Sequence, residues 1–321
     1  MAIAARLRSR RAVLRLAGAG ALGAAVALRA GVLRSPESGD GAATASTTTL
    51  SAATLATPTA TPTPRPVPAA GRSTSALLPG TPWEASFDVT HSGLAGPTVL
   101  LLGGVHGNEP GGWLAADELR SWQPAIGSLI VVPRANALAI RTLERTLPEL
   151  GDLNRLYPGN PDGLPMARMA AAITALATAH HVDLLIDMHE SWAFYGERPQ
   201  NGTAYLGQTI TSGAGPASAT IAEALAAAVN ARLVVPRDRF FSRGPNAASS
   251  GNSANGQAQA PGGADVTATP GRSTSSLSLG RHVAALTPVL VEMGQDGQPL
   301  ARRIELHMLV AHTVLQLHGM A

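Results

Sequence analysis

Short apolar runs and longer amphipathic stretches alternate along most of the chain. Apolar runs that end in turn residues predict buried strands at 98–104, 128–136, 182–189, 232–236 and 288–294. Apolar residues at helical spacing predict helices at 110–122, 166–181, 217–231 and 300–320. Strands that alternate with helices in this way indicate an α/β fold, in which helices cover a central sheet.

The first part of the chain departs from this pattern. Residues 1–34 begin with charged positions and continue with an apolar stretch at 14–28, which is the layout of an export signal. Arg10 and Arg11 stand side by side ahead of that stretch and resemble a twin-arginine signal. The apolar stretch is short for a membrane span, and a general secretory signal or a short membrane anchor is the alternative. We therefore expect an exported, extracytoplasmic protein, whether periplasmic, cell-surface or secreted.

Two other segments have the composition of chain that does not fold by itself. Residues 35–76 are rich in Thr, Pro and Ala, which predicts an extended linker. Residues 244–276 are polar and rich in glycine, which predicts a disordered insertion. The remaining pattern predicts one folded domain at 77–321 that is interrupted by this insertion.

Charge and composition limit the partners and the metal ligands that the chain can have. The formal net charge is +3, and all 24 basic residues are arginine. Seven of them lie in residues 1–34, which contain no acidic residue, whereas the chain from Ser73 onward has 15 arginines and 19 acidic residues. The basic character thus belongs to the front segment, and we expect no nucleic-acid partner. Because the chain has no cysteine, a transition metal would have to be bound by His, Asp or Glu.

Polar side chains follow two of the predicted strands, where α/β sheets bind ligands. His106 and Glu109 lie in a glycine-bounded loop after the first strand, and His189 ends the third. Three protein ligands are typical of a zinc site that performs hydrolysis. Asp187 precedes His189 by two residues and shares its strand face, which makes it a candidate partner of that imidazole. An exposed polar loop is the alternative interpretation of His106 and Glu109 taken alone.

Further along the chain, other residues fit the same chemistry. Asn154 and Arg155 stand side by side in a predicted loop, and arginine can bind a carboxylate through two parallel hydrogen bonds. Glu292 ends a late apolar strand, where a carboxylate is costly unless it is used. A glutamate beside the metal is the usual base in hydrolytic zinc sites.

Five motifs in this order resemble the zinc carboxypeptidase superfamily, and within it the succinylglutamate desuccinylase/aspartoacylase branch: GGVHGNEPGG, PRANALAIR, GDLNRLYPG, IDMHES and VEMGQ. The resemblance implies a mixed central β-sheet flanked by helices, in the three-layer sandwich of the zinc carboxypeptidases. It also implies one zinc ion per chain, with His106, Glu109 and His189 as its ligands.

The resemblance further implies roles for the remaining residues. Asn154 and Arg155 would bind the carboxylate of the substrate, and Glu292 would activate water and then give its proton to the leaving amine. A further arginine would polarise the scissile carbonyl. Arg145 is our choice for it, with Arg141 and Arg134 as the alternatives.

Together these features predict an exported zinc hydrolase that cleaves an amide bond next to a free carboxylate, as a deacylase of N-acyl amino acids. The substrate would be a small molecule or a peptide that carries a carboxylate. Since the chain carries an export signal, a zinc carboxypeptidase or an amidase that acts on cell-wall or other peptides is the alternative. A catalytically silent binding domain at the cell surface is a third interpretation.

Other conspicuous residues have structural interpretations. His307 lies on the last predicted helix without a histidine four residues away, which favours a surface or boundary position. Glu190 follows His189 and is interpreted as a polar loop residue. The aromatic residues within 192–195 either line a substrate pocket or pack in the core.

Overall fold

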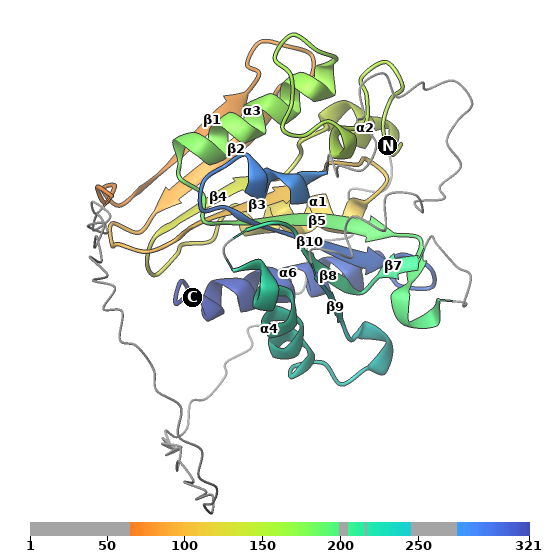
Figure 1. Cartoon of the computed structure of the whole chain (residues 1–321). Helices are drawn as coiled ribbons and strands as arrows, with labels where there is room; N and C mark the ends of the chain where they lie inside the picture. Colours follow the sequence, from red (N-terminus) through yellow and green to blue (C-terminus); the bar gives the residue numbers. More distant parts are fainter. Residues whose placement is uncertain (1–64, 199–204, 216, 245–274) are drawn as a thin grey trace, which may run out of the picture. The chain divides into compact units, whose positions relative to one another are not determined.

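A mixed sheet of eight strands runs through the centre of the protein (Figure 1). The computed structural model describes residues 65–198, 205–215, 217–244 and 275–321. The predicted export signal, most of the predicted linker and nearly all of the predicted insertion lie outside these residues. The strand order is β1-β2-β4-β3-β5-β10-β8-β9.

The strands of this sheet are β1 (Gly71–Leu77), β2 (Ala85–His91), β3 (Thr98–Gly103), β4 (Ser128–Val132), β5 (Leu184–Ser191), β8 (Thr209–Ser212), β9 (Phe241–Arg243) and β10 (Thr287–Gly294). A separate short pair consists of β6 (Ala193–Phe194) and β7 (Tyr205–Gly207). The helices are α1 (Pro110–Leu119), α2 (Ala137–Thr142), α3 (Pro165–Ala179), α4 (Ser218–Asn230) and α6 (Leu300–Leu317). Single 3-10 turns are η1 (Leu153–Arg155), η2 (Tyr195–Glu197), η3 (Pro236–Asp238) and η5 (Ser276–Arg281).

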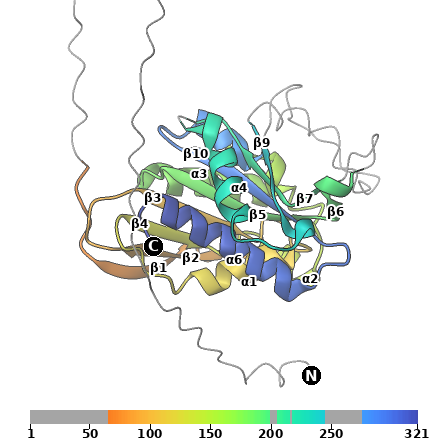
Figure 2. The same ribbon diagram turned by 90° about the horizontal axis from the view of Figure 1, so that it is seen from below.

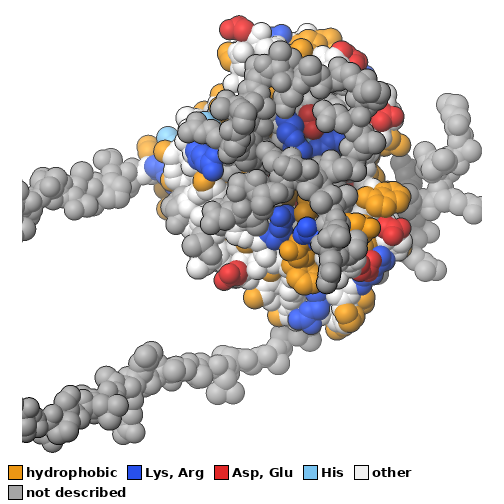
Figure 3. Space-filling model, turned by 45° about the vertical axis from the view of Figure 1, so that its right-hand side comes forward, with side chains coloured by type: hydrophobic (Ala, Val, Ile, Leu, Met, Phe, Trp, Pro, Cys, Tyr) orange, Lys and Arg blue, Asp and Glu red, His pale blue; other side chains and the backbone are white. Residues whose placement is uncertain are grey.

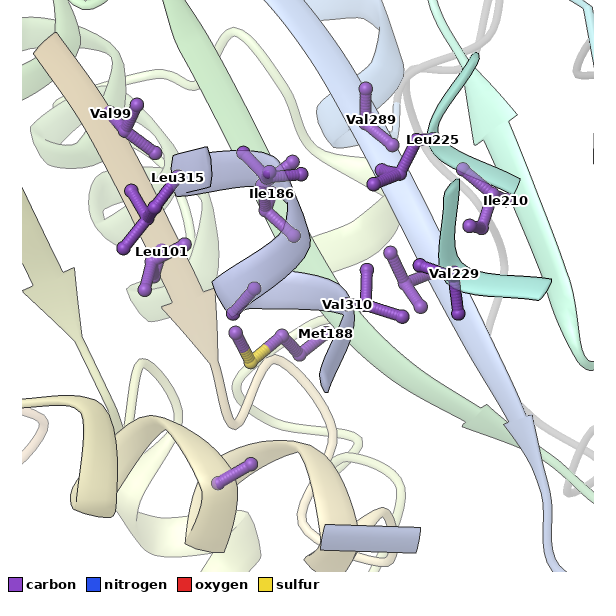
Figure 4. Packing of buried hydrophobic residues seen from close by; sticks show 14 of the residues in the cluster. Val99, Leu101, Ile186, Met188, Ile210, Leu225, Val229, Val289, Val310 and Leu315 are labelled. Carbon is purple, nitrogen blue, oxygen red and sulfur yellow. The ribbon is translucent and has the colours of Figure 1, made fainter. Parts of the chain in front are cut away.

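Helices cover both faces of the sheet, as Figures 1 and 2 show. Helices α1, α4 and α6 lie on one face, which we call the α6 face, and α3 lies on the other, the α3 face. Each face has its own apolar core. Leu101 and Ile186 belong to the core on the α6 face (Figure 4), whereas Leu100 and Leu185 belong to the core on the α3 face. The alternation follows from the two-residue period of a strand, and the predicted three-layer α/β sandwich is confirmed.

The winding of the sheet reverses between β3 and β5. Strand β3 pairs in parallel with β4 on one side and with β5 on the other, and β10 continues in parallel beyond β5. The connection from β3 leads to β4, and the connection from β4 leads back across β3 to β5. Ligands of open α/β sheets bind at such a switch point, outside the carboxyl ends of the strands.

Close backbone packing fixes the loop that leaves β3 at this point. Gly104 has a φ of +69°, which favours glycine. At Gly107 a Cβ atom would lie 2.0 Å from the carbonyl oxygen of Ala139, so a side chain has no room there. The glycines of the loop thus let it pass tightly over α2.

Most of the predicted helices and strands are present, with differences at two places. The strand predicted at 232–236 is wrong: these residues leave α4 through a turn, and Val234 is 93% exposed, with no neighbouring strand to bury it. Strand β1 lies within residues assigned to the linker. It is an edge strand whose antiparallel partner is β2, and most of its side chains are exposed, so it lacks an apolar run. No helix of the described residues is long and apolar enough to cross a membrane.

Candidate metal centre

Three buried side chains converge at the switch point. His106 and Glu109 come from the loop between β3 and α1, and His189 comes from β5. His106 Nδ1 lies 2.6 Å from Glu109 Oε1, and His189 Nδ1 lies 2.8 Å from Glu109 Oε2. The two Nδ1 atoms are 3.1 Å apart. The structure therefore brings the three predicted ligands together, with one possible ligand atom of each within 4.8 Å of the others.

In both histidines, Nε2, the ring nitrogen farther from Glu109, faces a second carboxylate. His106 Nε2 lies 3.2 Å from Asp152 Oδ1, and His189 Nε2 lies 3.0 Å from Asp187 Oδ2. Because Nδ1 of each ring faces Glu109, both nitrogens of each ring lie beside a carboxylate, and a metal ion bound through Nδ1 would leave the N–H on Nε2. The lone pairs of both Nδ1 atoms then point at each other and at Glu109. Such an arrangement suits a bound cation, and two histidines with one glutamate are a ligand set of hydrolytic zinc sites.

The pKa shifts of Glu109 and His189 also favour a bound cation. Burial would raise the pKa of Glu109, but the facing His106 and His189 hold it well below its usual value. Burial would lower the pKa of His189, but Asp187 and Glu109 raise it well above its usual value. The cluster thus attracts positive charge, and a metal ion would compete with protons for the same Nδ1 atoms.

Asp152 is a residue of the site that the sequence analysis missed. Its Oδ2 accepts from Arg145 Nη2 at 3.2 Å, while its Oδ1 faces His106. Burial would raise the pKa of Asp152, but the charges of His106, Arg145 and Arg155 lower it strongly. Asp152 also accepts the backbone N–H of Asn154 and so begins η1. An aspartate that begins a helical turn is common, so nothing local in the sequence pointed to its second role.

Arg145 lies beside the three converging side chains, unlike the two alternatives. Its Nη1 is 3.6 Å from Glu109 Oε1. Arg141 is exposed on α2. Arg134 pairs with Asp117 and lies over the ring of Trp113, which is a structural role. Of these three arginines, Arg145 is the one that lies against Glu109.

Glu292 adjoins the cluster from the neighbouring strand. It pairs in register with His189 across β10 and β5, so both side chains point to the α3 face. Its Oε2 is buried and has no hydrogen-bond partner among the described residues. Burial raises the pKa of Glu292 to about 8, and the charge of Glu109 adds to this, whereas His189 and Arg145 oppose it. A buried carboxyl oxygen without a partner, next to three candidate metal ligands, is a candidate proton acceptor.

Asn154 and Arg155 lie in η1, next to Asp152, and make no direct contact with the three converging side chains. Asn154 is buried, and its Oδ1 accepts the backbone N–H of Ser276 at 3.3 Å. Arg155 Nη1 donates to the carbonyl oxygen of Asn154 at 2.8 Å. The pair thus occupies a loop at the side of the centre, close to the point where η5 begins.

Two interpretations made from the sequence are wrong. Glu190 is not a loop residue: it lies within β5, its side chain is fully buried on the α6 face, and it pairs with Arg303. His307 is not at the surface, since it is 1% exposed and burial lowers its pKa to about 3. In both cases the cause is the packing of α6, which carries Arg303 and His307, against the sheet.

The aromatic residues after His189 differ among themselves. Phe194 is buried, and the guanidinium of Arg237 lies 3.8 Å from its ring centroid, so it has a packing role. Tyr195 lies against the ring of Phe241, with 5.4 Å between the centroids. Trp192 is 62% exposed. The packing alternative therefore holds for Phe194.

Several arginine side chains lie near the middle of the side toward which β5 and β10 run, with acidic side chains around them (Figure 3). The blue side chains in Figure 3 are all arginine, because the chain contains no lysine. Arg145 and Arg155 belong to the loops at the carboxyl ends of the strands. An anionic molecule would be attracted to this side.

Most residues of this site lie in a segment that matches a known protein family. Residues 95–195 match the catalytic domain of succinylglutamate desuccinylase/aspartoacylase. The matched segment contains the three converging residues, both carboxylates that face the imidazoles, and Arg145. Over these residues the chain is similar to the succinylglutamate desuccinylase/aspartoacylase family. Glu292 lies beyond the match, so its place in the site comes from the structure.

One relative is similar in sequence. An N-alpha-acetyl-L-2,4-diaminobutyric acid deacetylase from Halomonas elongata is 38% identical over 98 residues. These residues make up 29% of this chain and 28% of that protein. The match therefore covers less than a third of either protein.

Solved structures share the fold. The D,L-carboxypeptidase Csd4 of Helicobacter pylori, in its mDAP-bound form, matches with a TM-score of 0.55 and 18% identity over 70% of this chain and 52% of that chain. The product-bound ectoine utilization protein EutE (DoeB) from Ruegeria pomeroyi matches with a TM-score of 0.54 and 22% identity over 80% of this chain and 70% of that chain. The chain thus spans about half the length of Csd4, and the likeness is one of fold.

Proposed function

We propose that this protein is an exported zinc-dependent hydrolase that cleaves an amide bond next to a free carboxylate, as a deacylase of N-acyl amino acids. One observation carries the proposal: three buried ligand atoms converge beside Glu292, whose buried Oε2 has no hydrogen-bond partner among the described residues. The deacetylase from Halomonas elongata supports an N-acyl amino acid as the substrate. The composition of residues 1–34 supports export, with the twin-arginine pathway as our choice.

The metal would be bound by His106 and His189 through Nδ1 and by Glu109 through its carboxylate. Zinc bound there would polarise the scissile carbonyl and lower the pKa of a water molecule. Asp152 and Asp187 hold the two imidazole rings so that Nδ1 faces inward. They would also make the rings more basic ligands.

The remaining chemistry falls to side chains of the chain itself. Glu292 would take a proton from the attacking water and deliver it to the nitrogen of the leaving amine. Its raised pKa suits a group that holds a proton between these two steps. Arg145 would donate to the carbonyl oxygen as negative charge develops on it.

The free carboxylate of the substrate would bind to Asn154 and Arg155. A guanidinium has five N–H donors, and the structure gives Arg155 one contact to the Asn154 carbonyl. Its other donors would be available for a carboxylate in the two-bond geometry that arginine favours. An amide bond close to that carboxylate would then lie over Glu109 and Glu292.

Peptides with a free carboxylate are the alternative substrates. The fold shared with a D,L-carboxypeptidase and the export signal favour this second candidate, in which the protein is a zinc carboxypeptidase or amidase acting on cell-wall or other peptides. Both candidates use the same metal, base and carboxylate site. Both release the amino acid that carries the free carboxylate, and they differ in whether the acyl part is a simple carboxylic acid or a peptide.

The test begins with the metal content of the purified full chain and of a His106→Ala variant. We expect about one zinc ion per chain, and its loss in the variant. Hydrolysis of a panel of N-acyl amino acids and a panel of peptides then separates the two candidates. A folded wild type that takes up no zinc would contradict the proposal and favour a catalytically silent binding domain.

A further inference from the structure

A buried ion pair lies directly behind the candidate metal centre, on the α6 face of β5. Glu190 Oε2 accepts from Arg303 Nη1 at 2.6 Å and from Gln295 Nε2 at 3.0 Å. The Glu190 side chain is 0% exposed and that of Arg303 is 12% exposed. Because successive residues of a strand point to opposite faces, Glu190 cannot join His189 in binding a cation.

The same carboxylate connects to the loop that carries the other two proposed ligands. Gln295 Nε2 also donates to the carbonyl oxygen of Asn108 at 2.9 Å. The backbone N–H of Glu190 donates to Glu109 Oε2 at 3.0 Å. A Cβ atom on Gly111 would lie 2.1 Å from Glu190 Oε1, so the first turn of α1 lies directly against the carboxylate. Glu190 thus touches the strand, the loop and the helix that together carry the three proposed ligands.

Stability alone does not account for an ion pair in this place. Taking two charges out of water costs about as much as their attraction returns, and an apolar pair of similar volume is often as stable. The neighbouring positions on the α6 face, Ile186 and Met188, are apolar and fully packed. What an apolar pair would lack is the set of directional hydrogen bonds between α6, the turn after β10 and the ligand loop.

Metal ligands need this kind of positional control, since a site loses affinity when its ligands deviate by about 0.5 Å. We propose that Glu190 and Arg303, together with Gln295, form a positioning network that holds the His106–Glu109 loop in register with His189 for metal binding. The inference rests on the proposed zinc site. Glu190 and Arg303 are positioning residues in it, because neither reaches the metal.

The test measures zinc affinity of the full chain by competition with a chromophoric chelator. We expect Arg303→Met to weaken zinc binding about tenfold. A double variant, Glu190→Met with Arg303→Met, removes the unpaired buried charge and should recover most of the thermal stability. It should still bind zinc about tenfold more weakly than the wild type. Arg303→Lys keeps a charge without the planar fork and should recover part of the affinity.

Arg302 offers a matched control on the same helix. Its Nη2 lies 2.6 Å from Asp238 Oδ2, the same distance as in the Arg303 pair, but this contact connects α6 to η3. Arg302→Met should therefore leave the zinc affinity within about twofold of the wild type.

The outcomes separate the two proposals. If the wild type binds zinc and the folded double variant binds it as tightly, the positioning network is refuted while the zinc site stands. An equal loss of affinity in Arg302→Met and Arg303→Met would also refute it, because the effect would then belong to α6 as a whole. If the wild type binds no zinc, the proposed function fails first, and the network fails with it.

Discussion

Strands β5 and β10 lie side by side in the middle of the sheet, and the two faces that they present differ in kind. On the α6 face, Met188 (Figure 4) and Val291 pack in an apolar core. On the α3 face, Asp187, His189 and Glu292 occupy the alternate positions. All five side chains are buried.

The comparison shows that burial by itself does not distinguish a packing residue from a chemical one. The two-residue period of a strand lets the same backbone serve a core on one side and a site on the other. The core face stabilises the strand, and the strand in turn holds the site residues at fixed spacing. Apart from the Glu190–Arg303 pair, we therefore expect substitutions on the α6 face to change stability and substitutions on the α3 face to change activity.

The largest effect should come from Glu292→Gln on the α3 face. The amide cannot accept the proton of the attacking water, so turnover should fall about 1,000-fold. Zinc content and melting temperature should stay close to those of the wild type, because Gln keeps the shape of the side chain. The measurement is steady-state hydrolysis of the best substrate from the panels. A loss of only a few-fold in a zinc-loaded variant would remove Glu292 from its assigned role.

On the α6 face, Met188→Ala should reduce the free energy of unfolding by about 3 kcal/mol, because it leaves a cavity next to β5. Zinc affinity should remain within about threefold of the wild type, since additivity holds between sites without shared partners. Denaturant unfolding and chelator competition measure the two quantities. Loss of zinc affinity without loss of stability would show that the two faces are not separable.

A third prediction concerns Arg145, which lies in the loop between α2 and η1. Arg145→Met should lower kcat/KM about 100-fold, through the loss of a donor to the developing negative charge. Arg141→Met, an exposed position on α2, is the matched control and should change kcat/KM by less than about twofold. Equal effects of the two substitutions would mean that Arg145 has been assigned the wrong role.

The smallest effect is expected at Asp152, behind the His106 ring. Asp152→Asn keeps an acceptor for the backbone N–H of Asn154, so η1 should persist. The amide holds the imidazole less firmly and makes it less basic, which should weaken zinc binding about tenfold. Chelator competition checks this. An unchanged affinity would reduce Asp152 to a residue that only begins a helical turn.

Much of the central fold could be predicted from the sequence, and the reason is local. The runs that became β3, β4, β5 and β10 are mostly apolar, are buried on both faces and end in turn residues, so composition and length identify them. Short or half-exposed strands such as β1 lack that signal, because their partners supply the hydrogen bonds and their outer faces meet solvent. The run at 232–236 had the signal and no partner, and it is not a strand.

Some residues of the candidate site could also be identified from the sequence, whereas others could be identified only from the structure. His106, Glu109, His189 and Glu292 stand at strand ends, where the chain itself marks them as unusual. Arg145 could not be separated from Arg141 by sequence, because only the path of the loop over Glu109 distinguishes the two. Asp152 gave no signal, since its contact with His106 joins residues far apart in the chain.

By itself, then, the sequence determined the α/β class, the polar ends of the central strands and the absence of thiolate ligands. Periodicity, turn residues and composition are local properties, and they need no knowledge of neighbours. Only the tertiary structure decided which polar groups face one another. It placed Glu190 against Arg303 and buried His307, because α6 covers the sheet from the far end of the chain. Long-range contacts of this kind depend on the packing of whole elements, which no short stretch of sequence contains.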